Sequence, residues 1–452
     1  MEGLEKNRIL EGNIVSGMLK LAFPLMVLNV INSLYSIVDT FWVGRLGELH
    51  VGAVSLISPI MSCGAAFAAG LSAAAMALIA MAIGAGDKER SNVIATHLIK
   101  LCIVFGVTIG IACVFCAKPI LNWLETPADI YNEAYMYLLG IALDFLFMFI
   151  LSLFQAIRQS NGDSKTGVKI NAIASAINVV LDPLLIFVCN LGVFGAALAT
   201  TISKLIVTPI ALHILMHEEV MTRVDFKKYK LELKILKEIV AVAIPASIGS
   251  FLSSFGFVMM NKSIVSYGSI AMSAYDIGNK ISGLCYIPLN SLGGALTPYI
   301  GQNLGANNEK RARESYVTGM KLSIVTSIII TIVGFISTKY IVLLFVNNAS
   351  AELLALACEY AYYSLATAIF MGWFNNLNGV FTGSGNTKYT LFLSTFRLWG
   401  LRIPMIYAFG AFTTLGPTGI WWSMCLSNLV TCIIGQTMYF VLPWSKQKLS
   451  KS

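Results

Sequence analysis

Residues 17–43 read GMLKLAFPLMVLNVINSLYSIVDTFWV, an apolar run of helical length that holds a single carboxylate, Asp39. A helix needs roughly 20 apolar residues to cross the hydrocarbon core of a bilayer. Eleven further runs of comparable length follow, separated by polar or Gly/Pro breaks. We therefore predict twelve transmembrane helices, at residues 17–43, 51–83, 95–117, 130–156, 169–189, 195–216, 238–266, 270–301, 316–337, 352–380, 389–411 and 419–441.

The composition is that of a membrane protein. Of 452 residues, 57% are hydrophobic and 12% are charged, whereas soluble proteins have roughly 45–50% and 25%. Too few polar residues remain to cover that apolar surface in water, which argues against a soluble fold. The nine cysteines lack metal-site or disulfide spacing, and neither HExxH nor paired Asp motifs for Mg²⁺ occur. We therefore expect no enzymatic activity and no cofactor.

Positive charge is distributed unevenly between alternate connections. Most of the 31 lysines and arginines fall on one side of the predicted helices, and the other side has only Arg45, Lys118, Lys262 and Lys339. Because Lys- and Arg-rich loops stay in the cytosol, we predict a multi-pass protein of the cell inner (plasma) membrane with both termini cytosolic. This topology accounts for the net charge of +8. We expect membrane lipids as partners and no nucleic acid.

The two halves of the chain repeat each other at an offset of 221 residues. Residues 22–24 (AFP) match 243–245 (AIP), and Gly84-Ala85 matches Gly305-Ala306. We therefore predict an all-α polytopic membrane protein with two pseudo-symmetric six-helix lobes around a central cavity. The N-lobe is expected at residues 1–216 and the C-lobe at 238–452. The polar segment 217–237 is expected to be a cytosolic linker with an amphipathic turn or two on the membrane surface.

Two carboxylates inside the predicted helices interrupt this repeat. Asp39 and Asp182 correspond to Met260 and Ile403 in the second half. Since the fold does not need an acid at these positions, and an ionised carboxylate in a bilayer is costly, we expect both to face a cavity or carry a proton or cation. The alternative is that they only hydrogen-bond neighbouring helices.

Helix five supplies further oxygen ligands next to Asp182. Asn178 lies four residues earlier, on the same helical face, and Pro183 leaves the carbonyl near Val179 without its usual donor. Oxygen ligands of this kind suit a proton or a small hard cation such as Na⁺. Asp39, Asn178 and Asp182 are therefore the predicted cation site, and they are metal ligands only if the coupling ion is Na⁺.

Other polar and soft side chains are candidates for the substrate cavity. Asp276 and Lys280, four apart on one helix, are expected to pair with each other or to meet substrate. Asp144 is expected to pair with Lys204 or with a main-chain group. Methionines and aromatic residues, Met259 and Met260 among them, would offer an adaptable surface to flat or cationic molecules. A cavity role and a structural role stay open for Glu359, Arg397 and Arg402.

The chain resembles the multidrug and toxic compound extrusion (MATE) family over essentially its full length. The resemblance is carried by residues 24–47 (PLMVLNVINSLYSIVDTFWVGRLG), 82–91 (AIGAGDKERS), 178–187 (NVVLDPLLIF) and 298–315 (PYIGQNLGANNEKRARES). Asp39, Asn178 and Asp182 match the N-lobe polar cluster of its DinF-like subgroup. The resemblance implies an alternating-access exporter that antiports lipophilic or cationic organic compounds against H⁺ or Na⁺, and we expect it to act as a monomer.

By position, the resemblance adds Thr200 to the cation cluster and Tyr35, Tyr137 and Gln155 to the cavity, although Asn is the more familiar residue at the position of Gln155. Another branch of the family has cation-binding carboxylates on helices seven and ten. Helix ten here has Asn375 instead, a further candidate for the substrate cavity. The alternative functions are a lipid-linked oligosaccharide flippase of the same superfamily, an exporter of one specific metabolite, and a passive channel.

Overall fold

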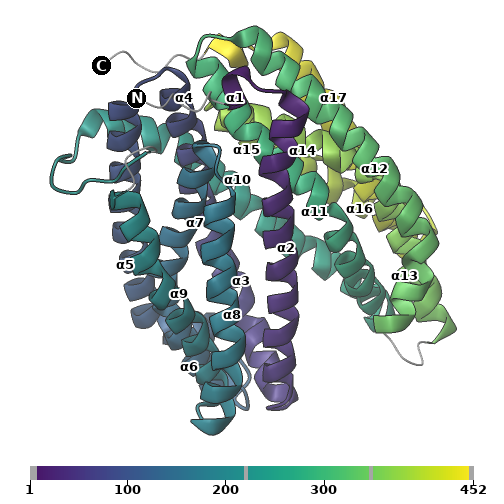
Figure 1. The fold of residues 1–452 in the computed structure, drawn as a ribbon. Helices are drawn as coiled ribbons and strands as arrows, with labels where there is room; N and C mark the ends of the chain where they lie inside the picture. The colour runs from purple at the N-terminus through teal and green to yellow at the C-terminus, as the bar shows by residue number, and fades with distance from the viewer. Residues whose placement is uncertain (1–7, 218–221, 346–349, 447–452) are drawn as a thin grey trace. The chain divides into compact units, whose positions relative to one another are not determined.

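The computed structural model describes residues 8–217, 222–345 and 350–446, and every regular element within them is helical (Figure 1). Three short segments, η1 to η3, are π-helical, and η4 is a 3₁₀ turn. In chain order the elements are α1 (Arg8–Glu11), α2 (Ile14–Gly44), α3 (Glu48–Ala74), η1 (Ala75–Ile79), α4 (Ala80–Gly84), α5 (Lys88–Trp123), α6 (Tyr131–Ala142), α7 (Asp144–Ser160), α8 (Lys165–Pro183), η2 (Leu184–Val188), α9 (Gly192–His217), α10 (Leu233–Val265), α11 (Ser269–Gly305), α12 (Glu309–Phe345), α13 (Ala351–Ala366), α14 (Ala368–Gly383), α15 (Thr387–Thr395), η3 (Phe396–Arg402), α16 (Ile403–Phe412), α17 (Pro417–Val441) and η4 (Trp444–Lys446).

All twelve predicted runs are helical, which confirms the all-α polytopic class. Within the described residues, eight unbroken spans are long and apolar enough to cross a membrane. Two bent pairs, α6–α7 at 44° and α13–α14 at 47°, raise the number to ten. The two remaining runs are α11 and the succession α15–η3–α16, both of which carry charged side chains.

Several helices begin earlier than their apolar runs because their first turns are polar. α5 starts seven residues before the predicted position 95, and α12 starts seven before 316. The Asp87 side chain accepts a hydrogen bond from the main-chain N–H of Arg90 at 2.9 Å, and Asn308 does the same for Arg311 at 3.0 Å. These two N-caps are 221 residues apart, so the repeat predicted from sequence extends to the capping of the helices.

The backbone also repeats at the turns between helices. Left-handed conformations recur at corresponding places in the two halves, and glycine occupies all but one of them, because L side chains are strained there. The pairs are Gly47 and Gly268, Gly86 and Asn307, Gly162 and Gly385, and Gly192 and Gly416.

Contacts divide the chain into two compact units, one of Met1–Met26 and Ile248–Ser452 and the other of Val27–Ser247. The predicted lobe boundaries were 216 and 238, so the observed division falls within α2 and α10 rather than at the linker. The physical reason lies in packing: Met18 of α2 belongs to the core cluster of α11, and Ser247 of α10 lies against Gly70 of α3. Residues 1–7, 218–221 and 447–452 of the predicted lobes and linker lie outside the described residues.

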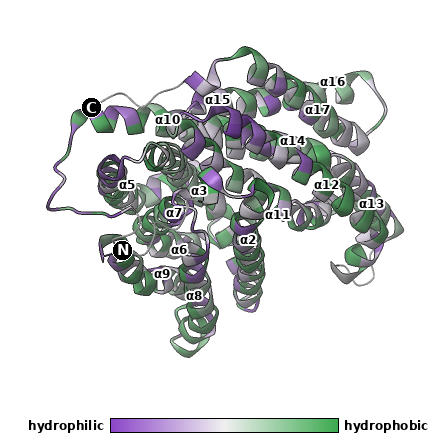
Figure 2. Cartoon of the chain, turned by 45° about the horizontal axis from the view of Figure 1, so that its top comes forward, coloured by the Kyte–Doolittle hydropathy of each residue, from purple (hydrophilic) through white to green (hydrophobic). Residues whose placement is uncertain are grey.

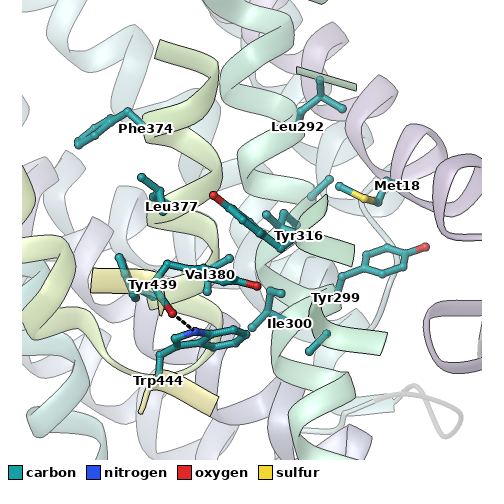
Figure 3. Packing of buried hydrophobic residues seen from close by; sticks show 14 of the residues in the cluster. Met18, Leu292, Tyr299, Ile300, Tyr316, Phe374, Leu377, Val380, Tyr439 and Trp444 are labelled. Carbon is teal, nitrogen blue, oxygen red and sulfur yellow. Dashed lines mark hydrogen bonds between the residues drawn. The ribbon is translucent and has the colours of Figure 1, made fainter. Parts of the chain in front are cut away.

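The core of the unit formed by Met1–Met26 and Ile248–Ser452 is aromatic at one end of its helices. Tyr316, Tyr439 and Trp444 pack together, and the Trp444 indole N–H donates to the carbonyl of Tyr439 at 2.9 Å (Figure 3). Asn386, in the turn before α15, donates to the carbonyl of Trp444 at 3.1 Å. These contacts join the described end of the chain to the α14–α15 turn.

The outer faces of the helices are apolar. Figure 2 shows hydrophobic residues along much of α8, α9 and α12. On α12 the side chains of Ile328, Ile332 and Ile336 are exposed at helical spacing. Exposing such apolar faces to water is unfavourable, whereas exposing them to the hydrocarbon of a bilayer is not, so the pattern agrees with helices that contact lipid.

The described part of the linker is held against α5. Residues 222–232 contain only one short turn and run along α5, because their main chain finds partners there. The buried His97 ring accepts from the N–H of Glu232 at 2.8 Å, and Thr96 accepts from the N–H of Asp225 at 3.1 Å. Nearby, Arg90 of α5 forms an ion pair with Glu238 of α10 at 2.9 Å. The main chain of the linker is therefore fixed to α5 by hydrogen bonds to its side chains.

Candidate functional site

Three helices of the Val27–Ser247 unit bring polar side chains together. The hydroxyls of Tyr35 on α2 and Thr200 on α9 share a hydrogen bond of 3.1 Å. Asn178 on α8, with its amide turned to match its surroundings, donates to Asp182 Oδ2 at 2.9 Å and accepts from the main-chain N–H of Thr200 at 3.0 Å. Thr200 therefore connects α2 with α8.

The two predicted carboxylates lie in this cluster. Asp182 is 0% exposed and Asn178 is 1% exposed, while Asp39 on α2 is half-buried. Neither acid has a Lys or Arg partner among the described residues, and the two are close enough to repel each other. Two ionised carboxylates without a counter-charge are unfavourable in a bilayer, and uptake of a proton or a cation would relieve both the repulsion and the burial of charge.

Lys204, a turn beyond Thr200 on α9, does not neutralise this pair. Its ammonium donates to Asp144 Oδ2 at 2.6 Å, and Asp144 is 2% exposed at the start of α7. Of the two partners expected for Asp144, Lys204 is therefore the one found. The consequence is that the lysine closest along α9 is already engaged, and the charge of Asp39 and Asp182 stays uncompensated.

A cavity of about 350 Å³ adjoins the cluster. Tyr35, Asn178 and Thr200 form part of its wall, and Lys204 forms another part. The rest of the wall consists of mostly polar or small side chains from α2, α7, α8 and α9, together with the apolar Met148 and Leu151 of α7, namely Asn32, Ser36, Met148, Leu151, Ser152, Asn171, Ala174, Ser175 and Ser203. Asp39 and Asp182 each lie one helical turn beyond a wall residue, Tyr35 and Asn178 respectively.

Sequence reasoning missed six polar residues of this wall, Asn32, Ser36, Ser152, Asn171, Ser175 and Ser203. For those on α2 and α8, the signal is nevertheless present in the spacing. Positions 171, 175, 178 and 182 of α8 are all polar, and this i, i+4, i+7, i+11 series forms one stripe on a helix. Positions 32, 36 and 39 form a similar stripe on α2.

Two other predicted residues of this half, Tyr137 and Gln155, do not line the cavity. Tyr137 on α6 is buried, and its hydroxyl contacts the Met61 sulfur at 3.9 Å. The Gln155 carbonyl oxygen accepts a long hydrogen bond, 3.5 Å, from Asn171. Gln155 therefore meets the cavity through Asn171, which is itself part of the wall.

The cavity residues predicted in the second half of the chain all lie in the unit of Met1–Met26 and Ile248–Ser452, and they are scattered there. Met260 is 0% exposed inside a packing cluster, whereas Met259 is half-buried. Asp276 on α11 is exposed. Asn375 on α14 donates to Asn290 of α11 at 2.7 Å. The structure does not gather these four residues as it gathers those around Asp182.

The chemistry of the first cluster suits a proton or an alkali cation better than a transition metal. No group of three or more His, Cys, Asp or Glu able to hold a metal occurs in the described ranges. The donors at hand are carboxylate, amide and hydroxyl oxygens, which hard cations prefer. As oriented, Asn178 serves Asp182 as a hydrogen-bond donor, so its oxygen would have to turn toward Asp182 to act as a Na⁺ ligand.

Comparison with known proteins decides the family. The model of the MatE family matches residues 24–184 and 245–408, which correspond to one another in the two halves of the chain. The protein belongs to the MatE family. Members of this multidrug efflux family are transporters and not enzymes, and this one is a multi-pass membrane protein.

Relatives of this MatE protein match it from end to end. It is 25% identical over 436 residues to the probable multidrug resistance protein YoeA of Bacillus subtilis, covering 95% of this chain and 94% of the relative. It is 23% identical over 435 residues to the probable multidrug resistance protein NorM of Thermotoga maritima, covering 95% and 93%.

A solved structure described as the outward-facing conformation of a multidrug resistance MATE family transporter matches this MatE chain with a TM-score of 0.92. The identity is 22%, and the match covers 99% of this chain and 100% of that one. The crystal structure of a MATE protein in complex with MaL6 gives the same TM-score at 22% identity, over 98% and 100% of the chains. These likenesses confirm the predicted two-lobed, twelve-helix fold.

Proposed function

We propose that this MatE protein is a secondary active exporter that antiports lipophilic or cationic organic compounds against H⁺ or Na⁺ by alternating access. The observation that carries the proposal is the pair of carboxylates, Asp39 and Asp182, held without a basic partner beside a cavity within the membrane-spanning helices. The names of the relatives, which describe multidrug resistance, support the substrate class.

The coupling follows from competition for the same negative charge. Protonation of Asp39 and Asp182, or Na⁺ binding between them, removes the charge that attracts a cationic compound to the neighbouring cavity. The ion and the compound therefore oppose each other, and each shifts the equilibrium between access states by its differential affinity for those states. Entry of the coupling ion then drives the departure of the compound.

Thr200 transmits the occupancy of the carboxylates to α2. It bonds Tyr35 of α2 through its hydroxyl and Asn178 of α8 through its main chain. When Asp182 is neutralised, the Asn178 amide loses an ionised acceptor, and a hydrogen bond to a charged group is roughly twice as strong as one to a neutral group. Asp182 then holds the Asn178 amide less firmly, so that this amide can change its contact with Thr200 and, through Thr200, with Tyr35 of α2.

The protein is proposed to act in the cell inner membrane with its termini in the cytosol. Small organic compounds and membrane lipids are its proposed partners, no cofactor takes part beyond the coupling ion, and the working unit is a monomer. The positive charge of the linker, with Lys227, Lys228 and Lys230, supports this orientation, since basic loops are retained in the cytosol.

Efflux of ethidium from proteoliposomes, under an imposed ΔpH or ΔNa⁺, tests this function. Wild type should move ethidium under one of the two gradients, which names the ion, and Asp182→Asn should abolish the gradient dependence. Tyr35→Phe, which keeps both carboxylates, should slow transport and retain coupling. Full coupled efflux by Asp39→Asn and Asp182→Asn, both well folded, would refute the role of the cluster. Failure of wild type under both gradients would favour a lipid-linked oligosaccharide flippase or an exporter of one metabolite.

A further inference from the structure

The π-helical segment η3 places two arginines on one face of a membrane helix. Arg397 and Arg402 are five residues apart. In an α-helix, residues five apart point roughly 140° away from each other. In a π-helix the main-chain hydrogen bonds join residues five apart, so two such residues lie nearly one above the other. The corresponding stretch of the first half, residues 176–181, is α-helical and carries no charge.

Both guanidinium groups are buried without a carboxylate. Arg397 is 7% exposed and Arg402 is 3% exposed. Arg402 donates only to neutral oxygens, to Ser427 Oγ at 3.0 Å and to Asn428 Oδ1 at 2.7 Å. No ion pair joins either arginine to an Asp or Glu of the described chain.

Of the two arginines, Arg397 has fewer of its N–H groups in hydrogen bonds. It contacts the Met371 sulfur at 3.7 Å and lies 4.0 Å from the ring centre of Phe374. Its Nε–H is buried and has no hydrogen-bond partner. A buried donor left unpaired is unfavourable, and more so when it is charged, so the site favours a ligand that can accept from it.

The arginines line a cavity of about 140 Å³ within the first unit. Its wall also contains Tyr286, Tyr360 and Trp421. This volume is close to that of a cavity of about 150 Å³ that is known to bind benzene. The pocket thus combines two uncompensated positive charges with aromatic side chains.

We propose that this pocket binds an anionic oxygen group, a carboxylate or phosphate, and that an aromatic carboxylate fits it best. Arg402 and Arg397 provide the charge, and the aromatic wall receives the ring. The unpaired buried charges of the two units then have opposite sign, carboxylates in one and arginines in the other. If the transported compound supplies the anion, which rests on the proposed function, compounds with both a cationic and an acidic group become the favoured substrate class.

Equilibrium dialysis of radiolabelled benzoate against the purified full chain, in detergent and a sulfonate buffer, tests the site. Wild type should bind benzoate saturably. Arg402→Gln and Arg397→Gln should each bind about tenfold more weakly or worse, since a hydrogen bond to a charged group contributes about 1.5–3 kcal/mol. Arg402→Lys should bind with intermediate affinity, because lysine keeps the charge but loses the forked geometry.

Arg313→Gln is the matched control, because Arg313 belongs to the same unit but is exposed and paired with Glu309 at 2.7 Å. It should bind benzoate like wild type. Displacement of benzoate by inorganic phosphate, with the same dependence on Arg402, would support the site with a free anion as occupant. Equal affinity of wild type and both Gln variants, folded by circular dichroism, or an equal loss in Arg313→Gln, would overturn the proposal. Arg402-dependent binding without ethidium export would retain this site and refute only the proposed transport.

Discussion

The ion pair between Asp144 and Lys204 offers a quantitative test of the charge balance next to the site. Asp144 is 2% exposed and Lys204 is 24% exposed, and their charged atoms are 2.6 Å apart. Replacing Asp144 by Asn keeps the shape of the side chain and leaves the ammonium without its counter-charge. Breaking a buried pair costs about 3–5 kcal/mol, but solvent reaches part of Lys204, so we expect a loss of about 2 kcal/mol.

Removing the lysine should lower the free energy of unfolding more than removing the aspartate. Lys204→Met leaves the deeply buried Asp144 carboxylate unpaired, and we expect a loss of about 3 kcal/mol or more in the free energy of unfolding. The double variant has no buried charge at this position. It should therefore be at least about 2 kcal/mol more stable than the two single losses would give if they were additive.

Thermal unfolding in detergent, followed by tryptophan fluorescence, measures these differences. For a unit of this length, 1 kcal/mol corresponds to roughly 2–4 °C in the midpoint. Asp144→Asn should thus lower the midpoint by about 4–8 °C. Strict additivity in the double variant, or unchanged midpoints in both single variants, would show that Lys204 is not engaged by Asp144 and is free to neutralise Asp182.

Two further predictions concern the turns. Gly86 has a φ of +74° and Asn307, at the equivalent turn, has a φ of +55°, both in the left-handed region. Because an L side chain is strained there, Gly86→Ala should lower the free energy of unfolding by about 1 kcal/mol, whereas Asn307→Gly should not. The same unfolding assay checks both changes. In the α7–α8 turn, burial raises the pKa of Asp163, but its hydrogen bonds to Thr166 and Arg158, together with the charge of Arg158, outweigh that effect, and the net pKa is lowered. Asp163 therefore contributes its full stabilisation above the unfolded-state pKa of about 3.9, and this contribution is lost as the pH falls through its lower folded-state pKa. Wild type should therefore lose stability on acidification, and Asp163→Asn should lack this component of the loss. Parallel curves of stability against pH for the two proteins would contradict the assignment.

The sequence predicted the number and kind of helices well, because apolar runs of membrane length are a strong signal. It predicted the starts of α5 and α12 less well, since their first turns are polar and do not contribute to an apolar run. The division into units could not be predicted from composition at all. Whether Met18 packs with α11 or with its sequence neighbours depends on contacts distant in the chain.

At the site, the two halves of the sequence differ in their buried acids. Asp39 and Asp182 stood out because their counterparts, Met260 and Ile403, are apolar. The same comparison left the role of Arg402 open, because it could not show that η3 is π-helical and turns both arginines to one side. Local helix geometry of that kind is set by packing and not by the residues alone.

The central claim is that the coupling cation is exchanged for the transported compound through Asp39 and Asp182. Its most direct test is ion entry driven by substrate: proteoliposomes are loaded with ethidium, and uptake of H⁺ or ²²Na⁺ is followed with no ion gradient imposed. The account predicts that ethidium leaving wild-type vesicles draws one of these ions inward, and that Asp182→Asn releases ethidium without ion entry or not at all. Ethidium-driven ion entry of wild-type size in Asp182→Asn would contradict the account.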